Sequence, residues 1–210
     1  MLPIVPLKRL GLPFVALAIL FLVGADPRAA KGADAPGPSD AADRPWSITL
    51  YGGRYTDNDL GDLFSNFSPD WKDSYIGTLA LAREFATLTR HIRFELEGQV
   101  VKHFSRQDHW EFNALVLSRW VTFPWNDYVY TTFAAGEGLS YATEVPRLEK
   151  ESHGTSHHLM DYLAFELSFS PPQHREWALV TRIHHRSGVF GLFGQWGGSN
   201  VLGAGLRYRF

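Results

Sequence analysis

The strictest pattern in the sequence is an alternation of apolar and polar side chains over residues 91–102, HIRFELEGQVVK. Successive side chains of a β-strand point to opposite faces, whereas a helix would scatter these charges around its circumference. Residues 91–102 are therefore predicted to form a strand with two unlike faces. The apolar face carries Ile92, Phe94, Leu96, Gly98 and Val100, and the polar face carries His91, Arg93, Glu95, Glu97 and Gln99.

Similar alternation predicts about eight strands after residue 45, where no apolar run approaches the length of a membrane helix. The predicted strands lie near residues 46–56, 74–86, 91–102, 109–122, 127–141, 158–170, 176–187 and 200–210. Their connections alternate in length. Residues 57–73, 103–108, 142–157 and 188–199 form mostly long connections, whereas 86–90, 123–127 and 171–175 form short ones.

Such strands fit either a soluble β-sandwich, which packs its apolar faces together, or an outer-membrane barrel, which turns them to lipid. The strand lengths match the roughly 9–11 tilted residues that cross a bilayer, and alternating loop lengths are typical of these barrels. Aromatic residues make up 14% of the chain, and Trp46, Trp120, Trp125 and Trp177 fall at the short-turn end, as in an aromatic girdle. We predict an all-β fold, an eight-stranded antiparallel transmembrane β-barrel of outer-membrane type over residues 46–210.

A barrel of about eight strands encloses only side chains, so a porin is the least favoured function. The charged residues of its polar faces are predicted to pair with one another inside the lumen. They are Arg93, Glu95, Glu97, Glu111, Arg119, Glu166 and Arg182.

Residues 1–25 have the layout of a secretory signal peptide, in which Lys8 and Arg9 precede an apolar run over residues 10–23. The alternative, a transmembrane anchor, needs a longer run of roughly 20 residues. Cleavage fits positions between residues 25 and 35, and residues 26–45 are rich in Ala, Pro, Gly and Asp, which is typical of a disordered lead-in. The chain is therefore expected to be exported to the outer membrane of a Gram-negative bacterium.

Composition excludes several classes of function. The chain has no cysteine, which rules out thiolate metal sites, disulfides and cysteine nucleophiles. Its formal net charge of −2 argues against a nucleic-acid partner, since such proteins carry a basic surplus. The sequence ends on an alternating strand that closes with Phe210, similar to the recognition signal of bacterial outer-membrane proteins. The barrel assembly machinery is thus an expected partner through Phe210.

The residues with the clearest catalytic potential lie at the end of the strand over 176–187. His185 and Ser187 continue its outward row. Two side chains that are two residues apart in a strand are neighbours on the same face. An imidazole in that position can take a proton from a serine hydroxyl. The alternative is that His185 only reaches the headgroup level and Ser187 begins the loop.

An acid that orients the imidazole is expected from the preceding hairpin, because no Asp or Glu follows Ser187. If PPQHR (171–175) is a tight turn centred on Gln173, His185 lies directly opposite Asp161. Asp161 is the single acid in the outward row of its strand. A register shift of one residue would turn one of the two side chains into the lumen.

The segment RIHHRSGVFGLF together with GGSNVLGAGLRYRF resembles the C-terminal end of the lipid A 3-O-deacylases (PagL-type), also called acyloxyacyl hydrolases. The resemblance covers about residues 176–210 and otherwise only the topology. It implies an eight-stranded barrel with a Ser/His/acid site on its outer wall that removes an ester-linked acyl chain from lipid A and requires no cofactor. The family's His-x-Ser motif falls on His185 and Ser187.

Two positions depart from the family pattern. The family usually has Asn after the serine, contributing to the oxyanion hole, where this chain has Gly188. Its acid is a Glu about a dozen residues after the serine, where this chain has Ser199 and Asn200. Either Asp161 replaces this acid, or the acid is dispensable, or the protein is not a competent hydrolase. The backbone N–H of Gly188 and the amide of Asn200 are the candidate oxyanion donors.

The primary hypothesis is an outer-membrane esterase whose partner is lipid A of lipopolysaccharide in the outer leaflet. The alternative is a non-catalytic barrel with a structural, adhesive or ligand-binding role, and a homodimer stays open. His153, His157 and His158 with Glu151 nearby suit either a metal site or, as we favour, a polar extracellular loop. The direction of Glu137 stays open because alternation around it is weak. Asp57, Asn58 and Asp59 lack the closing Glu of a calcium loop.

Overall fold

The computed structural model describes residues 44–210 except 67 and 195–197. The expected signal peptide (1–25), its cleavage region and all but the last two residues of the expected lead-in (26–45) lie outside the described residues.

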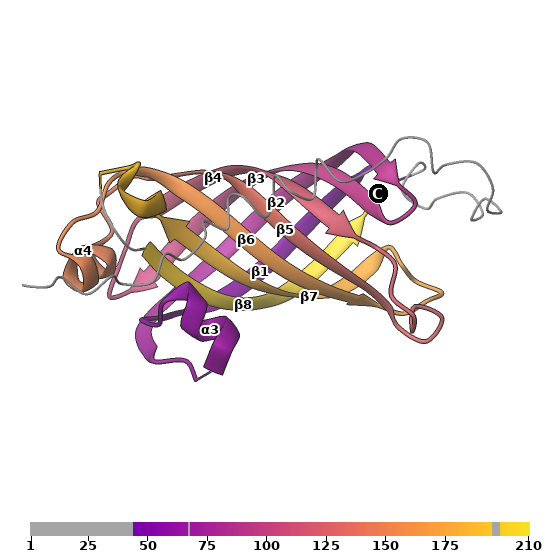
Figure 1. Cartoon of the computed structure of the whole chain (residues 1–210), viewed down its shortest axis with the longest axis horizontal. Helices are drawn as coiled ribbons and strands as arrows, with labels where there is room; N and C mark the ends of the chain where they lie inside the picture. The colour runs from indigo at the N-terminus through magenta and orange to yellow at the C-terminus, as the bar shows by residue number, and fades with distance from the viewer. Residues whose placement is uncertain (1–43, 67, 195–197) are drawn as a thin grey trace, which may run out of the picture. The chain divides into compact units, whose positions relative to one another are not determined.

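Eight antiparallel strands close into a barrel in which each strand pairs with its neighbours in the sequence and β8 pairs with β1 (Figure 1). The C-terminus takes part in the closure, because the backbones of Trp46 and Phe210 exchange two hydrogen bonds of 3.2 and 2.9 Å. The all-β fold class predicted from alternation is confirmed. The strands are β1 (Trp46–Thr56), β2 (Trp71–Thr89), β3 (Ile92–Ser105), β4 (Trp110–Trp120), β5 (Tyr130–Ala142), β6 (Leu159–Ser170), β7 (Trp177–Ser187) and β8 (Gly198–Arg209).

The outer surface of the barrel is apolar along most of its length, as a lipid-facing wall requires. Leucines of the outward rows are more than half exposed, such as Leu50 at 65%, Leu96 at 56% and Leu206 at 57%. The outward rows end in exposed aromatic rings, in line with the predicted girdle. At the short-turn end these include Trp46, Trp120 and Trp177, with Trp125 exposed in the β4–β5 turn, and at the opposite end Trp71, Trp110 and Tyr141.

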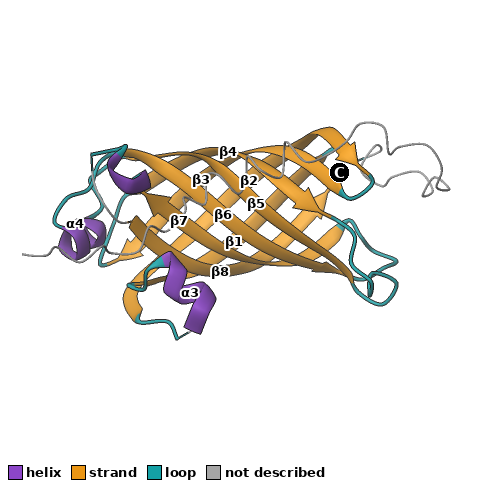
Figure 2. Ribbon diagram, in the orientation of Figure 1, coloured by secondary structure: helices purple, strands orange, loops and turns teal. Residues whose placement is uncertain are grey.

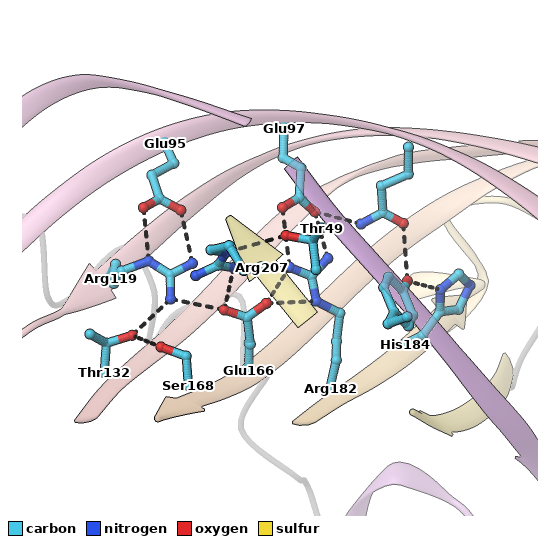
Figure 3. A network of polar contacts seen from close by, with 12 residues as sticks. Thr49, Glu95, Glu97, Arg119, Thr132, Glu166, Ser168, Arg182, His184 and Arg207 are labelled. Carbon is cyan, nitrogen blue, oxygen red and sulfur yellow. Dashed lines mark hydrogen bonds and ion pairs between the residues drawn. The ribbon is translucent and has the colours of Figure 1, made fainter. Parts of the chain in front are cut away.

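The lumen is filled by charged side chains that pair with one another (Figure 3). Arg119 donates two hydrogen bonds of 2.8 Å to Glu95 and one of 2.9 Å to Glu166. Arg182 bonds both Glu97 and Glu166, and Arg207 also donates to Glu166. Because buried charges are stable only when they are paired, this network explains how a narrow barrel accommodates its polar row.

Two short α-helices and one 3-10 helix, η1 (Val189–Gly191), lie in connections that the sequence predicts to be loops (Figure 2). α3 (Leu60–Asn66) lies in the β1–β2 connection, and α4 (Arg147–His153) lies in the β5–β6 connection. Seven residues are too few for a helix to be stable by itself, so both depend on tertiary contacts. Phe64 of α3 packs edge-on against Phe165 on the outer face of β6, with ring centroids 5.2 Å apart.

α4 lies at the loop end of the barrel (Figure 1), where its buried Glu149 accepts a hydrogen bond of 2.8 Å from Arg186 of the inward row of β7. No helix within the described ranges is long and apolar enough to span a membrane.

Candidate active site on the outer wall

His185 and Ser187 occupy the last outward positions of β7, at the end that leads into the long β7–β8 connection. Their neighbours His184 and Arg186 point into the lumen, where both are buried. His185 is only 8% exposed although it faces away from the lumen. A covering element must therefore shield this part of the outer wall.

The register between β6 and β7 differs from the predicted one. Asp161 pairs with Ser187, and His185 pairs with Leu163, so the expected Asp161–His185 pair is wrong by two positions. The connection contains two overlapping turns, with hydrogen bonds from His174 N to Pro171 O and from Trp177 N to His174 O. This longer connection moves the centre of the hairpin one residue beyond Gln173. Asp161 keeps the expected outward direction but lies beside the serine.

Asn200, and not the predicted Asp161, lies next to the imidazole of His185. It pairs directly with His185 across β7 and β8, and its Oδ1 lies 2.8 Å from Nδ1 of His185. Its Nδ2 donates to the backbone carbonyl of Asn58 at 2.8 Å, which fixes the amide so that Oδ1 accepts. The imidazole therefore carries its proton on Nδ1 and keeps a lone pair on Nε2.

Both ends of the Asn200 amide are thus engaged, and the side chain is 2% exposed. This arrangement does not fit the expected role of Asn200 as an oxyanion donor. The contact of Asn200 with His185 could not be predicted because the long β7–β8 connection defines no turn centre from which a register could be derived.

The β1–β2 connection supplies the cover over the site. It contacts Asn200 through the Asn58 carbonyl, and its helix α3 lies against the outside of the wall (Figure 1). Asp57 anchors its beginning by accepting hydrogen bonds from Ser152, at 2.7 Å, and from Lys72. Partial burial raises the pKa of Asp57, but these hydrogen bonds outweigh it and hold the pKa below its usual range.

Ser187 is followed at once by a strained turn. Val189 has a φ of 45°, a left-handed conformation that a β-branched residue rarely adopts. The turn directs the Val189 N–H to Oγ of Ser187 at 3.0 Å. Within the described part of the chain no hydrogen bond joins Ser187 to His185, so proton transfer between them requires a rotation of the serine side chain.

Close approach of β8 to this turn depends on a glycine. A Cβ at Gly198 would lie 1.9 Å from the carbonyl oxygen of Arg186 and 3.1 Å from Cε1 of His185. Gly198 pairs with Ser187 across the two strands. The absence of a side chain there thus leaves room for the imidazole.

Two acidic side chains, the exposed Glu137 and the buried Asp161, lie on outward positions near the site. Glu137, whose direction the sequence left open, points outward and is exposed on β5. It pairs with Leu163, and the neighbouring outward pair is Leu139 with Asp161. Glu137, Asp161 and Ser187 therefore follow one another across three adjacent strands of a wall that is apolar along most of its length. Ionisable groups on such a wall are costly, which points to a function there.

Two of the three loop histidines contact backbone carbonyl groups. His153 contacts the carbonyl of Gly198 at 2.8 Å, and His158 contacts the carbonyl of Ala142 at 2.8 Å. Their partners are backbone groups, as suits a polar extracellular loop.

No family model and no curated protein matches the sequence. Solved structures do match. The outer membrane enzyme PagL is 10% identical with a TM-score of 0.50, over 78% of this chain and 99% of that one. Neisserial surface protein A (NspA) is 12% identical with a TM-score of 0.49, over 79% and 97%. Ail of Yersinia pestis is 14% identical with a TM-score of 0.38, over 80% and 99%.

At these identities the similarity shows the fold and not the activity. The closed barrel, its apolar outer wall and its paired lumen support an outer-membrane location. The chain is an eight-stranded β-barrel of the outer-membrane type.

Proposed function

We propose that this protein is an outer-membrane esterase that removes an ester-linked acyl chain from lipid A. The observation that carries the proposal is His185 on the outer wall, held at Nδ1 by Asn200 and two residues from Ser187. A base oriented by a third group, next to a hydroxyl nucleophile, is the arrangement that acyl transfer needs. Asn also serves as the orienting group in the Cys-His-Asn sites of papain-like proteases.

The reaction proceeds in two steps. Ser187 Oγ attacks the ester carbonyl while Nε2 of His185 takes the hydroxyl proton, and the tetrahedral intermediate then expels the sugar oxygen, which receives that proton. The serine now carries the acyl chain as an ester. A water molecule, deprotonated by the same Nε2, attacks this ester and releases the fatty acid, and the proton returns to Ser187.

The negative oxygen of each tetrahedral intermediate needs hydrogen-bond donors. Because the Asn200 amide is engaged, we assign this role to the backbone N–H of Gly188, which follows the nucleophile directly. Asp161 does not contact His185 and takes no part in these steps as we write them. Its carboxylate borders the serine across the β6–β7 pair.

The height of the site suits the substrate. His185 and Ser187 lie at the loop end of β7, on the face that the wall turns to lipid. The ester linkages of lipid A lie near the headgroup level of the outer leaflet, so an acyl chain along the wall reaches the serine without leaving the bilayer.

Purified barrel incubated with lipid A in detergent is the direct test. Mass spectrometry is expected to show the loss of one acyl chain and an equal amount of free fatty acid, neither of which forms with a mock preparation from cells that carry the empty vector. Intact lipid A after incubation with folded barrel would remove the esterase proposal.

One observation favours a second function, that of a non-catalytic barrel. Ser187 Oγ bonds the Val189 N–H rather than His185, and no acid occupies the family's position. A fluorophosphonate probe separates the two functions. An esterase is expected to be labelled at Ser187, whereas the serine of a structural barrel should not react.

Asn200→Ala is expected to lower the deacylation rate by about 10- to 100-fold, since the imidazole loses the bond that orients it. Asn126→Ala is a matched control, because Asn126 also uses both ends of its amide but lies in the β4–β5 turn at the far end. Rates of fatty-acid release from lipid A measure both variants. Equal rates for the wild type and Asn200→Ala would exclude Asn200 as a positioning residue.

A further inference from the structure

A second group of reactive side chains lies inside the barrel, on the other side of the wall. It consists of His103 at the end of β3, His109 in the β3–β4 turn, Glu111 on β4 and His184 on β7. His103, His109 and Glu111 are buried, and each offers a ligand atom within 4.8 Å of those of the other two.

The β3–β4 hairpin brings the first three together. The backbone N of His103 donates to the carbonyl of His109 at 3.0 Å, so the two residues face each other across the turn. Their rings stack with centroids 4.1 Å apart. Glu111 lies two residues beyond His109 on the same inward face, and its Oε2 is 2.9 Å from Nε2 of His103.

His184 reaches the same carboxylate from the opposite wall. Its Nε2 lies 2.9 Å from Oε1 of Glu111. Its Nδ1 lies 3.1 Å from the hydroxyl groups of both Tyr51 and Tyr162. Figure 3 shows His184 at the edge of the paired lumen network. These tyrosines fix the ring and leave Nε2 directed at the cluster.

Two polar atoms of the cluster have no hydrogen-bond partner among the described residues although they are buried. They are Nδ1 of His103 and Nε2 of His109, whereas Oε1 of Glu111 and Nε2 of His184 face each other at 2.9 Å. An unpaired buried polar atom costs about 1–3 kcal/mol, so two such atoms on a pair of stacked rings call for an explanation. Farther along the lumen, Arg119 and Glu166 are paired, although Oγ1 of Thr78 and Oδ1 of Asn113 also have no hydrogen-bond partner.

We propose that His103, His109 and Glu111 bind a divalent zinc ion inside the lumen, with His184 as the fourth ligand. Two or three imidazoles with one carboxylate are a ligand set that zinc prefers, and the absence of cysteine removes competition from thiolates. Ligand atoms of a tetrahedral zinc ion lie about 3.4 Å apart, given bonds of about 2.1 Å. The ligand atoms of His103, His109 and Glu111 now lie within 4.8 Å of one another, and an ion would draw them and His184 toward a common point.

Such an ion would join the β3–β4 hairpin to β7 across the lumen. It would satisfy the unpaired atoms and add a cross-link that the hydrogen-bonded wall does not provide. The site lies on the inner face, whereas Ser187 lies on the outer face. The zinc proposal therefore does not depend on the esterase proposal.

The test uses barrel extracted from membranes of cells that express the full chain, freed of metal by a chelator. Titration with Zn²⁺ against a chromophoric competitor is expected to give one ion per chain, and Co²⁺ is expected to give the intense visible bands of a four-coordinate site. Zn²⁺ is also expected to raise the Tm of the wild type.

His109→Ala removes a ligand from a turn rather than from a strand, so strand packing stays intact. Its Zn²⁺ affinity is expected to fall by more than the 10- to 100-fold that loss of an outer-shell partner causes. His174→Ala is the matched control, because His174 lies 3.2 Å from Glu176 in an exposed turn at the other end. Its affinity for Zn²⁺ is expected to equal that of the wild type.

Absence of stoichiometric binding by the wild type would overturn the proposal, as would equal affinity in His109→Ala or loss of binding in His174→Ala. The Tm of each variant without metal shows that it is folded. If His109→Ala does not fold, His103→Gln takes its place, with the same expected loss of affinity and of the Co²⁺ bands.

Discussion

Replacing Ser187 with alanine is expected to reduce deacylation of lipid A by about 10³-fold or more, to the rate without enzyme. The hydroxyl oxygen is the atom that forms the covalent bond with the acyl group, so no other group in the site replaces it. Removal of the hydroxyl also frees the Val189 N–H, which is a small change at a half-buried position. Mass spectrometry of lipid A from cells that express the wild type or the variant measures the effect.

Ser118→Ala provides the matched control. Ser118 is an exposed serine in the outward row of β4, with the same direction toward lipid but no histidine two residues away. Its replacement is expected to leave the lipid A profile unchanged. Equal deacylation by Ser187→Ala and the wild type, with both barrels folded in the outer membrane, would show that the nucleophile lies elsewhere.

The strands and their faces could be predicted from the sequence because alternation has a fixed physical meaning in a barrel. Residues that face lipid are apolar, and the polar residues between them face the lumen. The sequence of each strand therefore indicates which of its faces points to lipid. In β7 the row from Ala178 to Arg186 points inward and the row from Trp177 to Ser187 points outward, as predicted. All eight strands lie within a few residues of their expected positions.

Pairing between strands could not be predicted as reliably, because it depends on how each turn closes. The β6–β7 connection holds two overlapping turns instead of one, which moves Asp161 from His185 to Ser187. That shift is even, so both side chains keep their faces while the partner changes. The role of the imidazole partner then passes to Asn200, on a strand whose register no local pattern defines.

The helices and the lumenal histidines were missed for a related reason. α3 and α4 are too short to show helical periodicity, and contacts such as Phe64 with Phe165 stabilise them only in the folded barrel. His103, His109 and Glu111 do carry a local signal, since a turn between His103 and His109 places all three on one face. The contribution of His184, 73 positions beyond Glu111 in the sequence, depends on closure of the barrel.

The lumenal network gives the largest expected effect on stability, at Glu166. This carboxylate accepts hydrogen bonds from Arg119, Arg182 and Arg207, and all four side chains are buried. Glu166→Gln keeps the shape but removes the charge and turns an N–H₂ group toward the guanidinium donors. Two carboxylates, Glu95 and Glu97, then remain to balance three buried arginines.

The free energy of unfolding is expected to fall by about 3–5 kcal/mol in Glu166→Gln, the cost of breaking a buried ion pair by removing one partner. Unfolding by urea, followed by tryptophan fluorescence in detergent or lipid, gives this quantity. Glu151→Gln is the matched control, since Glu151 also bonds two arginines, Arg106 and Arg147, but on the surface. Its loss is expected to stay below about 1 kcal/mol because exposed ion pairs are screened by water. Similar losses in the two variants would mean that the lumen is hydrated, since only water inside the barrel could screen the unpaired arginines as the bulk solvent screens Arg106 and Arg147.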